Sequence, residues 1–153
     1  MIKISSNLNE VTTRLVAKLQ EVNDPNGAAR DRMLRQVASD TLANVKYRIH
    51  TEGLNSAGQP IGQYSSAYLR IREKNNRGRN PKVILSLTGQ MENDFSIVSS
   101  QANRYGLGFK NTLNADKAEW LQDEYGRVYD LTQEETDHAG LVANDFIAEY
   151  LNG

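Results

Sequence analysis

The segment Glu52-Gly-Leu-Asn-Ser-Ala-Gly-Gln-Pro-Ile-Gly62 is a Gly-rich polar loop, and a basic run follows it. A short apolar turn, Ile84-Leu-Ser-Leu-Thr-Gly-Gln-Met91, comes next. Both flanking regions are patterned for burial, yet the loop and the basic run are too polar to fold on themselves. A compact domain rarely keeps so much polar chain exposed unless a partner orders it. We therefore expect residues 52–82 to form an extended basic arm, inserted between the second helix and the sheet, that becomes fully ordered only against a partner.

Upstream of this arm the sequence predicts two long helices. Leu8, Val11, Leu15, Leu19 and Val22 recur at intervals of three and four, which indicates an amphipathic helix. Asp24-Pro-Asn-Gly27 ends it with turn chemistry. A second helix is expected over 28–49. Its apolar face consists of Leu34, Val37, Ala38, Thr41, Val45 and Ile49.

Within the arm, a short helix is expected over 65–74, capped by Ser65 or Ser66. Residues 75–81 have no large apolar side chain and are expected to form a flexible tip. After the arm, 83–87 is compatible with a strand or a helical turn. Thr88 is well placed to cap a turn that runs through Asn93.

The remaining sequence predicts a hairpin and two helices. Two β segments, 95–98 and 105–109, are joined by a loop over 99–104, and a helix over 115–125 stops at Gly126. An extended stretch, 127–131, leads to a capping box, Thr132-Gln-Glu-Glu135, that opens the last helix. The fold class is therefore α+β: long helices packed on a small antiparallel β-sheet, with a long flexible arm, in a single domain spanning 1–153.

Composition restricts the classes of protein that fit. The 153 residues are enough for one domain with a core of its own. There is no cysteine, which excludes disulfides and thiolate metal sites. Met1-Ile-Lys-Ile4 is followed at once by polar residues, so we expect no signal peptide, and no apolar run reaches the ~20 residues of a membrane span. We expect a soluble protein made in a cytoplasm, with no membrane partner.

Charge is distributed unevenly along the chain although the net charge is only -1. Residues 28–82 hold eleven Lys or Arg and four Asp or Glu, a net +7, whereas 116–153 hold two basic and ten acidic residues, a net -8. One interpretation is two solvated faces of one domain. The other is a head-to-tail contact in which the basic region of one copy meets the acidic region of the next, which builds a ring if it closes.

No spacing in the sequence is typical of catalysis. His50 and Glu52 are two possible metal ligands without a third, and an exposed histidine at a helix end is the commoner reading. His138 sits among carboxylates at the start of the last helix. Gly106 and Gly108 lack the rest of a phosphate loop. We therefore predict no enzyme, no cofactor and no metal, since a small hydrolase would need a buried acid–base pair that nothing here suggests. Trp120, with Leu121 and Tyr125, is expected to be a core or interface anchor.

The basic run carries six cations against Glu73, a net +5 over 70–82. It can be a solvated surface, or it can contact nucleic-acid phosphate or an acidic protein face. Tyr64 and Tyr68 are the only nearby rings, so sequence-specific recognition of nucleic acid is not expected.

Three motifs give the chain a family resemblance: Gly58-Gln-Pro-Ile-Gly-Gln-Tyr64-Ser-Ser-Ala-Tyr68, Arg77-Gly-Arg79, and Ile84-Leu-Ser-Leu-Thr88-Gly89-Gln-Met91-Glu-Asn-Asp-Phe95. Together they resemble the virion morphogenesis and tail-completion proteins of tailed phages, which join head and tail. The combination of the Thr-Gly turn with the upstream Tyr helix is more specific than either alone. The resemblance covers roughly the second two-thirds of the chain.

The chain also departs from this family. Ile61 stands where the family often has an aromatic residue, and Gln90-Met91 replaces the usual Arg-Leu. The segment 127–135 lacks the family's prolines and has Tyr129 where Phe is usual. These departures bear on the identity of the partners more than on the general role.

The resemblance implies a non-enzymatic ring subunit, commonly sixfold, at the neck of the virion. Its partners would be other copies of itself, the head connector or portal-side adaptor and the tail tube, with DNA passing through the lumen as a possible non-specific contact. The alternative from the residues is a nucleic-acid-binding accessory protein that uses the 70–82 run. The candidate assembly contacts are Tyr64, Tyr68, Arg70, Arg72, Lys74, Arg77, Arg79, Lys82, Thr88 and Gly89.

Overall fold

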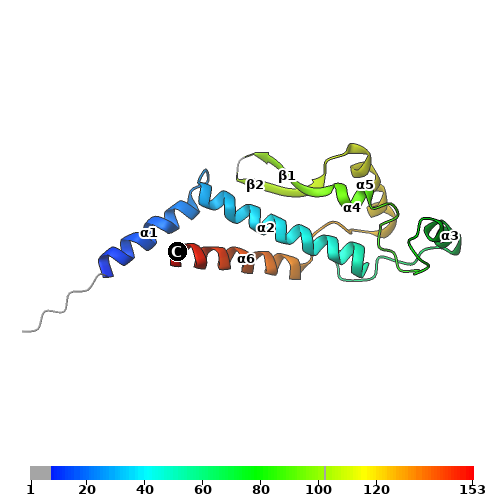
Figure 1. The fold of residues 1–153 in the computed structure, drawn as a ribbon, viewed down its shortest axis with the longest axis horizontal. Coiled ribbons are helices and arrows are strands. Elements are labelled where there is room, and N and C mark those ends of the chain that lie inside the picture. Colours follow the sequence, from blue (N-terminus) through cyan, green and yellow to red (C-terminus); the bar gives the residue numbers. More distant parts are fainter. Residues whose placement is uncertain (1–7, 102) are drawn as a thin grey trace, which may run out of the picture.

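The computed structural model describes residues 8–101 and 103–153, and its spine is a long helix, α2 (Ala28–Tyr47). The molecule is elongated (Figure 1): α1 (Leu8–Asn23) projects from one end, and α3 (Ser66–Lys74) lies at the other. A two-stranded antiparallel sheet lies along α2. The predicted α+β class, with helices packed on a small antiparallel sheet, is confirmed.

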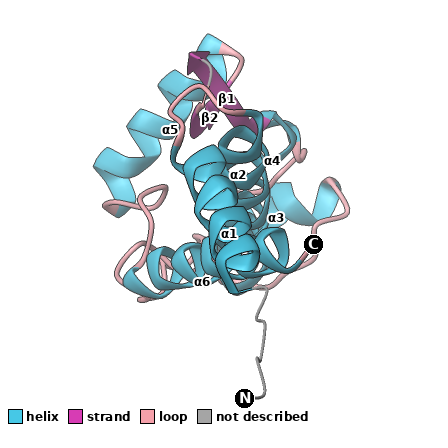
Figure 2. Cartoon of the chain, turned by 90° about the vertical axis from the view of Figure 1, so that its left-hand side faces the viewer, coloured by secondary structure: helices cyan, strands magenta, loops and turns pink. Residues whose placement is uncertain are grey.

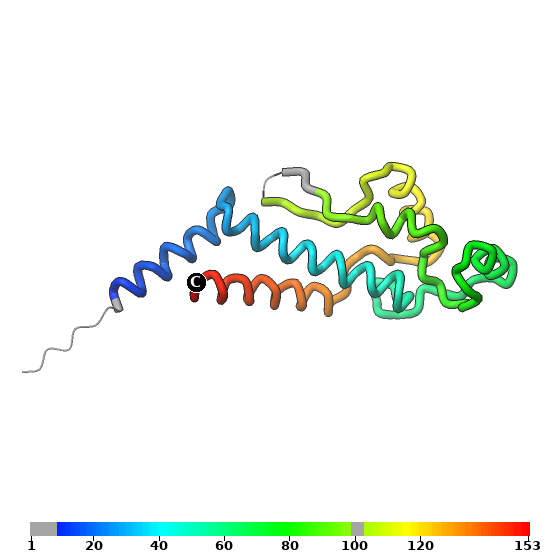
Figure 3. Tube along the Cα trace, in the orientation of Figure 1, coloured from blue at the N-terminus to red at the C-terminus, as the bar shows by residue number. Residues whose placement is uncertain are grey.

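The helical layer consists of α1, α2 and α6 (Gln133–Asn152). The tube in Figure 3 shows α6 running antiparallel beside α2, and in the end-on view of Figure 2 the hairpin lies on the opposite side of α2 from α6. Helix α1 ends before the turn at 24–27, as the sequence predicts, whereas α2 begins at the predicted Ala28 but ends at Tyr47, two residues before the predicted end at 49. The bend between them is closed by the Gly27 amide, which donates to the Asp24 carbonyl at 3.0 Å.

At its far end α2 continues into a π-helical turn, η1 (Arg48–Glu52). Gly53 ends this turn with a left-handed φ of 67°. A Cβ at this position would lie 2.6 Å from the carbonyl oxygen of Val83, so both the backbone angle and the space require glycine. The chain can therefore turn sharply from the helix into the arm.

The hairpin pairs β1 (Phe95–Gln101) with β2 (Arg104–Phe109), in continuous register from Phe95↔Phe109 to Ser99↔Tyr105, with a register shift before the last pair, Gln101↔Arg104. Both predicted strands are confirmed. The predicted loop over 99–104 is too long, because backbone pairing continues through Ser99↔Tyr105. Residue 102 of that loop lies outside the described residues.

Two short helices complete the elements: α4 (Gln90–Asp94) precedes the hairpin and α5 (Thr112–Tyr125) follows it. Segment 83–87 is neither the strand nor the helical turn that its pattern allowed. It is a series of bends, with Leu85 at a φ of 47°. The segment 127–131 is likewise irregular, without strand pairing.

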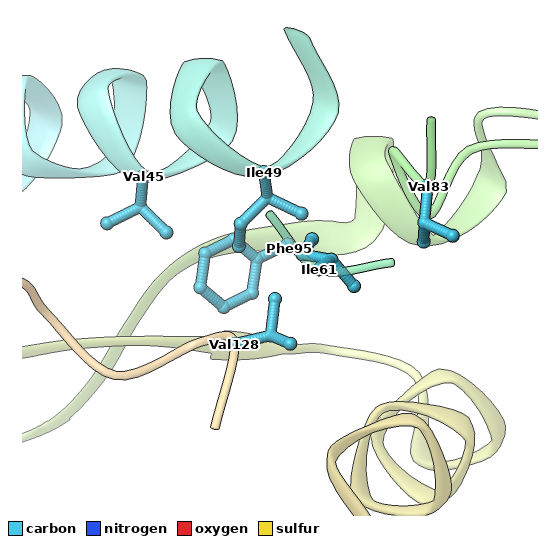
Figure 4. Packing of buried hydrophobic residues seen from close by; sticks show 6 residues of the cluster. All are labelled: Val45, Ile49, Ile61, Val83, Phe95 and Val128. Carbon is cyan, nitrogen blue, oxygen red and sulfur yellow. The ribbon is translucent and has the colours of Figure 1, made fainter. Parts of the chain in front are cut away.

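The hydrophobic core is small and lies where these elements meet (Figure 4). Six buried side chains converge from α2, η1, the arm, β1 and the segment after α5: Val45, Ile49, Ile61, Val83, Phe95 and Val128. Burial of each such side chain contributes about 1.5–3 kcal/mol. Because Ile61 and Val83 belong to the two ends of the arm, the core fixes both of its attachment points.

A buried ion pair joins η1 to the start of α6. Arg48 Nε donates to Glu135 Oε1 at 2.7 Å. The two terminal nitrogens of Arg48 donate to the carbonyls of Leu54, Val128 and Asp130 at 2.9–3.0 Å. One guanidinium thus connects η1, the arm, the segment after α5 and α6.

Glu135 also belongs to the capping box of α6. Its Oε2 accepts from the Thr132 amide at 2.9 Å, and Thr132 Oγ1 accepts from the Glu135 amide at 3.0 Å. The predicted capping box is confirmed. The same carboxylate therefore begins the last helix and holds it to η1.

We expect Arg48→Met to lower the free energy of unfolding by about 3–5 kcal/mol, because it leaves the Glu135 carboxylate buried and unpaired. Urea unfolding followed by circular dichroism measures this loss. Arg127→Met is the control: it removes an exposed pair with Asp130 (2.7 Å) and is expected to cost less than about 1 kcal/mol. Equal losses in the two variants would contradict the assigned role of Arg48.

Candidate docking groove

An open groove of about 750 Å³ lies where the base of the arm meets α4 and α5. Its walls come from residues 63–68, residues 85–91 and one face of α5. They are mainly aromatic and aliphatic: Tyr64, Tyr68, Leu85, Leu87, Met91, Trp120, Leu121 and Tyr125. The charged groups at the groove are Lys117 and Glu124, both on α5. Such a surface is suited to binding an apolar segment.

Two tyrosines are held in place at the groove wall. The Tyr64 hydroxyl accepts from the Ile84 amide at 3.1 Å, and its ring lies 5.0 Å from the ring of Tyr68. Tyr68 stands in the first turn of α3, which Ser65 caps by accepting from the Tyr68 amide at 3.2 Å. Burial raises the pKa of Tyr68 and that of Tyr125, so both hydroxyls remain neutral at physiological pH.

The arm itself is hydrogen-bonded within the chain, which corrects the expectation that it cannot fold on itself. The Ile61 amide donates to Gly53 O at 2.9 Å, and the Tyr64 amide donates to Pro81 O at 2.6 Å. The first bond closes the loop over 53–61, and the second joins the two sides of the arm at its base, as does the Val83 amide, which donates to Gly62 O at 3.0 Å. These hydrogen bonds could not be predicted from the polar side chains, because they use main-chain groups, which every residue type has.

Arg72 is not a free surface cation as the basic run suggested. It is 2% exposed, and its Nη1 donates to the Ser86 carbonyl and, at 3.4 Å, to the Tyr64 hydroxyl. Its guanidinium lies 4.5 Å from the centroid of the Tyr64 ring. Arg72 is therefore buried beneath the groove wall, where it holds the Tyr64 ring and the Ser86 carbonyl.

The other five cations of the basic run are only partly available for contact with a partner. Arg77 Nε donates to the Leu87 carbonyl at 2.6 Å, and Arg79 Nε lies 3.6 Å from a carboxylate oxygen of Glu73. Lys82 is half-buried at the base of the arm, with its side chain over Gly53. Arg70 and Lys74 are exposed on α3.

Thr88 and Gly89 both line the groove, but the cap of α4 differs from the prediction. Gly89, not Thr88, is the N-cap residue, with a left-handed φ of 79°. Thr88 Oγ1 accepts from the Gln90 amide at 3.3 Å, so the threonine hydroxyl still satisfies an orphan N–H of this turn, as predicted.

The most exposed aromatic of the groove is Trp120, at 64%. This exposure excludes the core role expected as one alternative for Trp120, and the role of interface anchor stays a prediction. Lys117, Trp120, Leu121 and Glu124 share one face of α5 through their spacing of three, four and seven. That spacing could have identified the face from the sequence, but nothing in the sequence placed it opposite the arm.

His50 is buried, at 7% exposed, instead of lying at an exposed helix end. Its Nδ1 lies 2.9 Å from the Ile84 carbonyl and must therefore carry the proton, while Nε2 is buried without a partner. Burial lowers the pKa of His50. Among the described residues no group of three or more His, Asp or Glu side chains is arranged to hold a metal ion.

No helix in the described part of the chain has the length and apolarity to span a membrane. No protein-family model, curated protein or solved structure matches the chain. A proposal for its function therefore depends on its own residues and their geometry.

We expect Arg72→Met to lower the free energy of unfolding by about 2 kcal/mol, because the Ser86 carbonyl loses a charge-assisted hydrogen bond. Arg70→Met, two residues away and exposed on the same helix, is expected to change it by less than about 0.5 kcal/mol. Urea unfolding compares the two variants. An Arg72→Met variant with the wild-type free energy of unfolding would show that the arginine does not support the groove.

His50 should make stability depend on pH. Its pKa is lowered in the folded state, so the unfolded chain takes up the proton first as the pH falls. Stability is thus fully present above the unfolded pKa, about 6.5, and is lost as the pH falls below it towards the folded pKa. Thermal unfolding between pH 8 and pH 5 should show a shallower fall in stability for His50→Asn than for the wild type. A wild-type slope in His50→Asn would contradict this assignment.

Proposed function

We propose that this chain is a structural subunit of the neck of a tailed phage, a tail-completion protein that forms a homo-oligomeric ring between head connector and tail. The observation that carries the proposal is the exposed apolar groove beside the arm. Its walls include the segments 63–68 and 85–91, which belong to two of the three motifs that resemble the phage family. Those motifs thus surround a surface suited to binding another protein.

The shape of the subunit supports a repeated contact. Apolar surface is exposed at both ends of the elongated molecule, on α1 at one end and at the groove at the other (Figure 1). Two different surfaces at opposite ends favour head-to-tail contacts, which form a ring when the rotation closes. The exposed cations of α3 and the acidic side chains of α6 add charge of opposite sign to such a contact.

In this proposal the ring sits in the virion, below the connector, and is assembled after synthesis in the bacterial host cytoplasm. Its partners are further copies of the chain, with six as the family's common number, together with the head connector or portal-side adaptor and the tail-tube protein. DNA passes through the lumen. The role requires no catalysis and no cofactor, because each contact is made by packing and charge.

A nucleic-acid-binding accessory protein is the second candidate, favoured by the exposed Arg70 and Lys74 on α3. With Arg72 buried and Arg79 beside Glu73, fewer cations remain for phosphate than the sequence count suggests. This candidate predicts retention on DNA at low salt that is lost in Arg70→Glu/Lys74→Glu with assembly unchanged. The ring subunit should instead assemble without DNA.

Native mass measurement of the purified protein, alone and with connector or tail-tube protein, tests the proposed function. We expect a closed oligomer or a stable complex with one of these partners. Trp120→Glu should abolish it, because a carboxylate would be buried in the groove. Leu113→Glu is the matched control, since Leu113 is equally exposed on α5 (68%) but lies outside the groove. A strictly monomeric protein that binds neither partner would contradict the proposal.

A further inference from the structure

We infer that the groove is filled by helix α1 of a second copy of this chain. This inference rests on the proposed ring and names the contact that builds it. Each subunit then presents one α1 at one end and one groove at the other, so the same contact repeats from copy to copy. A helix lying in an apolar groove is a common mode of recognition.

The apolar stripe of α1 is buried in its own molecule only at its C-terminal end. Val22 is 4% exposed, but Leu19, Leu15 and Val11, on the same face, are 37–40% exposed. Near the same end, Lys18 Nζ donates to the Tyr150 carbonyl at 3.1 Å, and the Tyr150 hydroxyl donates to Glu21. The first three turns of α1 therefore project beyond the body with their apolar side uncovered.

The chain cannot fill its own groove with this helix. Figures 1 and 3 show α1 at one end of the molecule, and α3, α4 and α5 at the other, with the length of α2 between them. Helix α2 and its continuation η1 are rigid spacers, fixed by the core and by Arg48. Only a second molecule can bring the two surfaces together.

The charges on the two surfaces are complementary. On α1, the charged side chains Glu10, Arg14, Lys18 and Glu21 follow one another at intervals of four, four and three, so they share one flank of the apolar stripe. The opposite flank carries the uncharged Thr12 and Val16. The two charged residues that line the groove, Lys117 and Glu124, are both on its α5 wall. The wall formed by residues 63–68 and 85–91 has no charged lining residue, and the exposed Arg77 lies against it with its Nε donating to the Leu87 carbonyl.

Spacing along the two helices fixes the orientation. Lys117 and Glu124 are seven residues apart, about 10.5 Å along α5, and Glu10 and Lys18 are eight residues apart, about 12 Å along α1. With the helices parallel, Glu10 lies opposite Lys117 and Lys18 lies opposite Glu124. Arg14, between them, faces the exposed ring of Trp120. With the helices antiparallel, the same alignment sets like charges against each other, so the parallel arrangement is favoured.

Neither Glu10 nor Lys117 has an ion-pair partner among the described residues, and both are exposed. They are the two charges that docking would satisfy without breaking a bond inside the subunit. Lys18, in contrast, already donates to Tyr150 within its own chain. The Glu10–Lys117 pair is therefore the cleaner one to test.

Disulfide trapping tests the contact directly, because the natural chain has no cysteine. Two single-cysteine proteins, Glu10→Cys and Lys117→Cys, are mixed and oxidised. We expect a covalent heterodimer as the main product, since a disulfide forms only where the two Cα atoms come within about 7 Å. Thr12→Cys, on the opposite flank of the apolar stripe of α1, replaces Glu10→Cys in the control and should give little of the heterodimer. Equal yields from the two mixtures would overturn the inference.

Substitutions in the otherwise native chain give a second readout. Leu15→Asp should weaken self-association by at least about tenfold, because the carboxylate would be buried in the groove, whereas Thr13→Asp should leave it unchanged. Glu10→Lys and Lys117→Glu should each weaken it by about two- to fivefold, and the double variant should recover most of the loss. Sedimentation equilibrium measures the self-association constant of each variant, and circular dichroism verifies that α1 remains helical.

These experiments distinguish a failure of the α1 contact from a failure of the proposed ring. An oligomer that forms normally in Leu15→Asp and gives no Glu10–Lys117 disulfide overturns the α1 contact and leaves the proposed ring standing on other surfaces. A wild-type protein that remains monomeric at every concentration and binds neither connector nor tail tube overturns both. Binding of α1 to a different protein, with no self-association, overturns the choice of a second copy as the occupant.

Discussion

The buried guanidinium of Arg48 is the constraint on which the rest of the structure depends. It occupies the point where η1, the base of the arm, the segment after α5 and the first turn of α6 meet, and it satisfies acceptors from the last three. The apolar core beside it is small, so packing alone would define these positions weakly. A buried guanidinium with four of its five N–H groups hydrogen-bonded has few alternative arrangements. The arm and the C-terminal helix are thus held in one geometry relative to the spine.

This geometry also determines where the groove lies. The η1 turn directs the chain into the arm at Gly53, and the arm returns at Val83 to the same core. Arg72 plays a similar, smaller role to Arg48: its buried guanidinium is held between the Ser86 carbonyl and the Tyr64 ring. Two buried arginines therefore shape a surface whose own residues are apolar and open to solvent. The molecule is rigid at its centre and exposes apolar surface at its ends, as a building block of an assembly would.

Sequence patterns predicted the local structure well, because local structure has local causes. The period of Leu8 to Val22, the alternation before Phe109 and the capping box at Thr132 each act within a few residues. The roles of Arg48 and Arg72 could not be found in this way. The partner of Arg48 is 87 positions away, and a cation within a basic run looks like its exposed neighbours until the fold shows which one points inwards. Tyr64, Tyr68, Thr88 and Gly89 were named from the sequence as candidate assembly contacts, and all four line the groove. Their placement opposite α5 is a product of tertiary structure and could not be predicted.

We propose that an elongated subunit with unlike apolar ends joins copies of itself into a closed ring. Electron microscopy of the purified protein, with two-dimensional classification of the particles, tests it most directly. We expect closed rings of uniform symmetry, with a central lumen wide enough for duplex DNA, which is about 20 Å in diameter. A homogeneous field of single elongated particles, at concentrations where partner proteins also fail to bind, would contradict it.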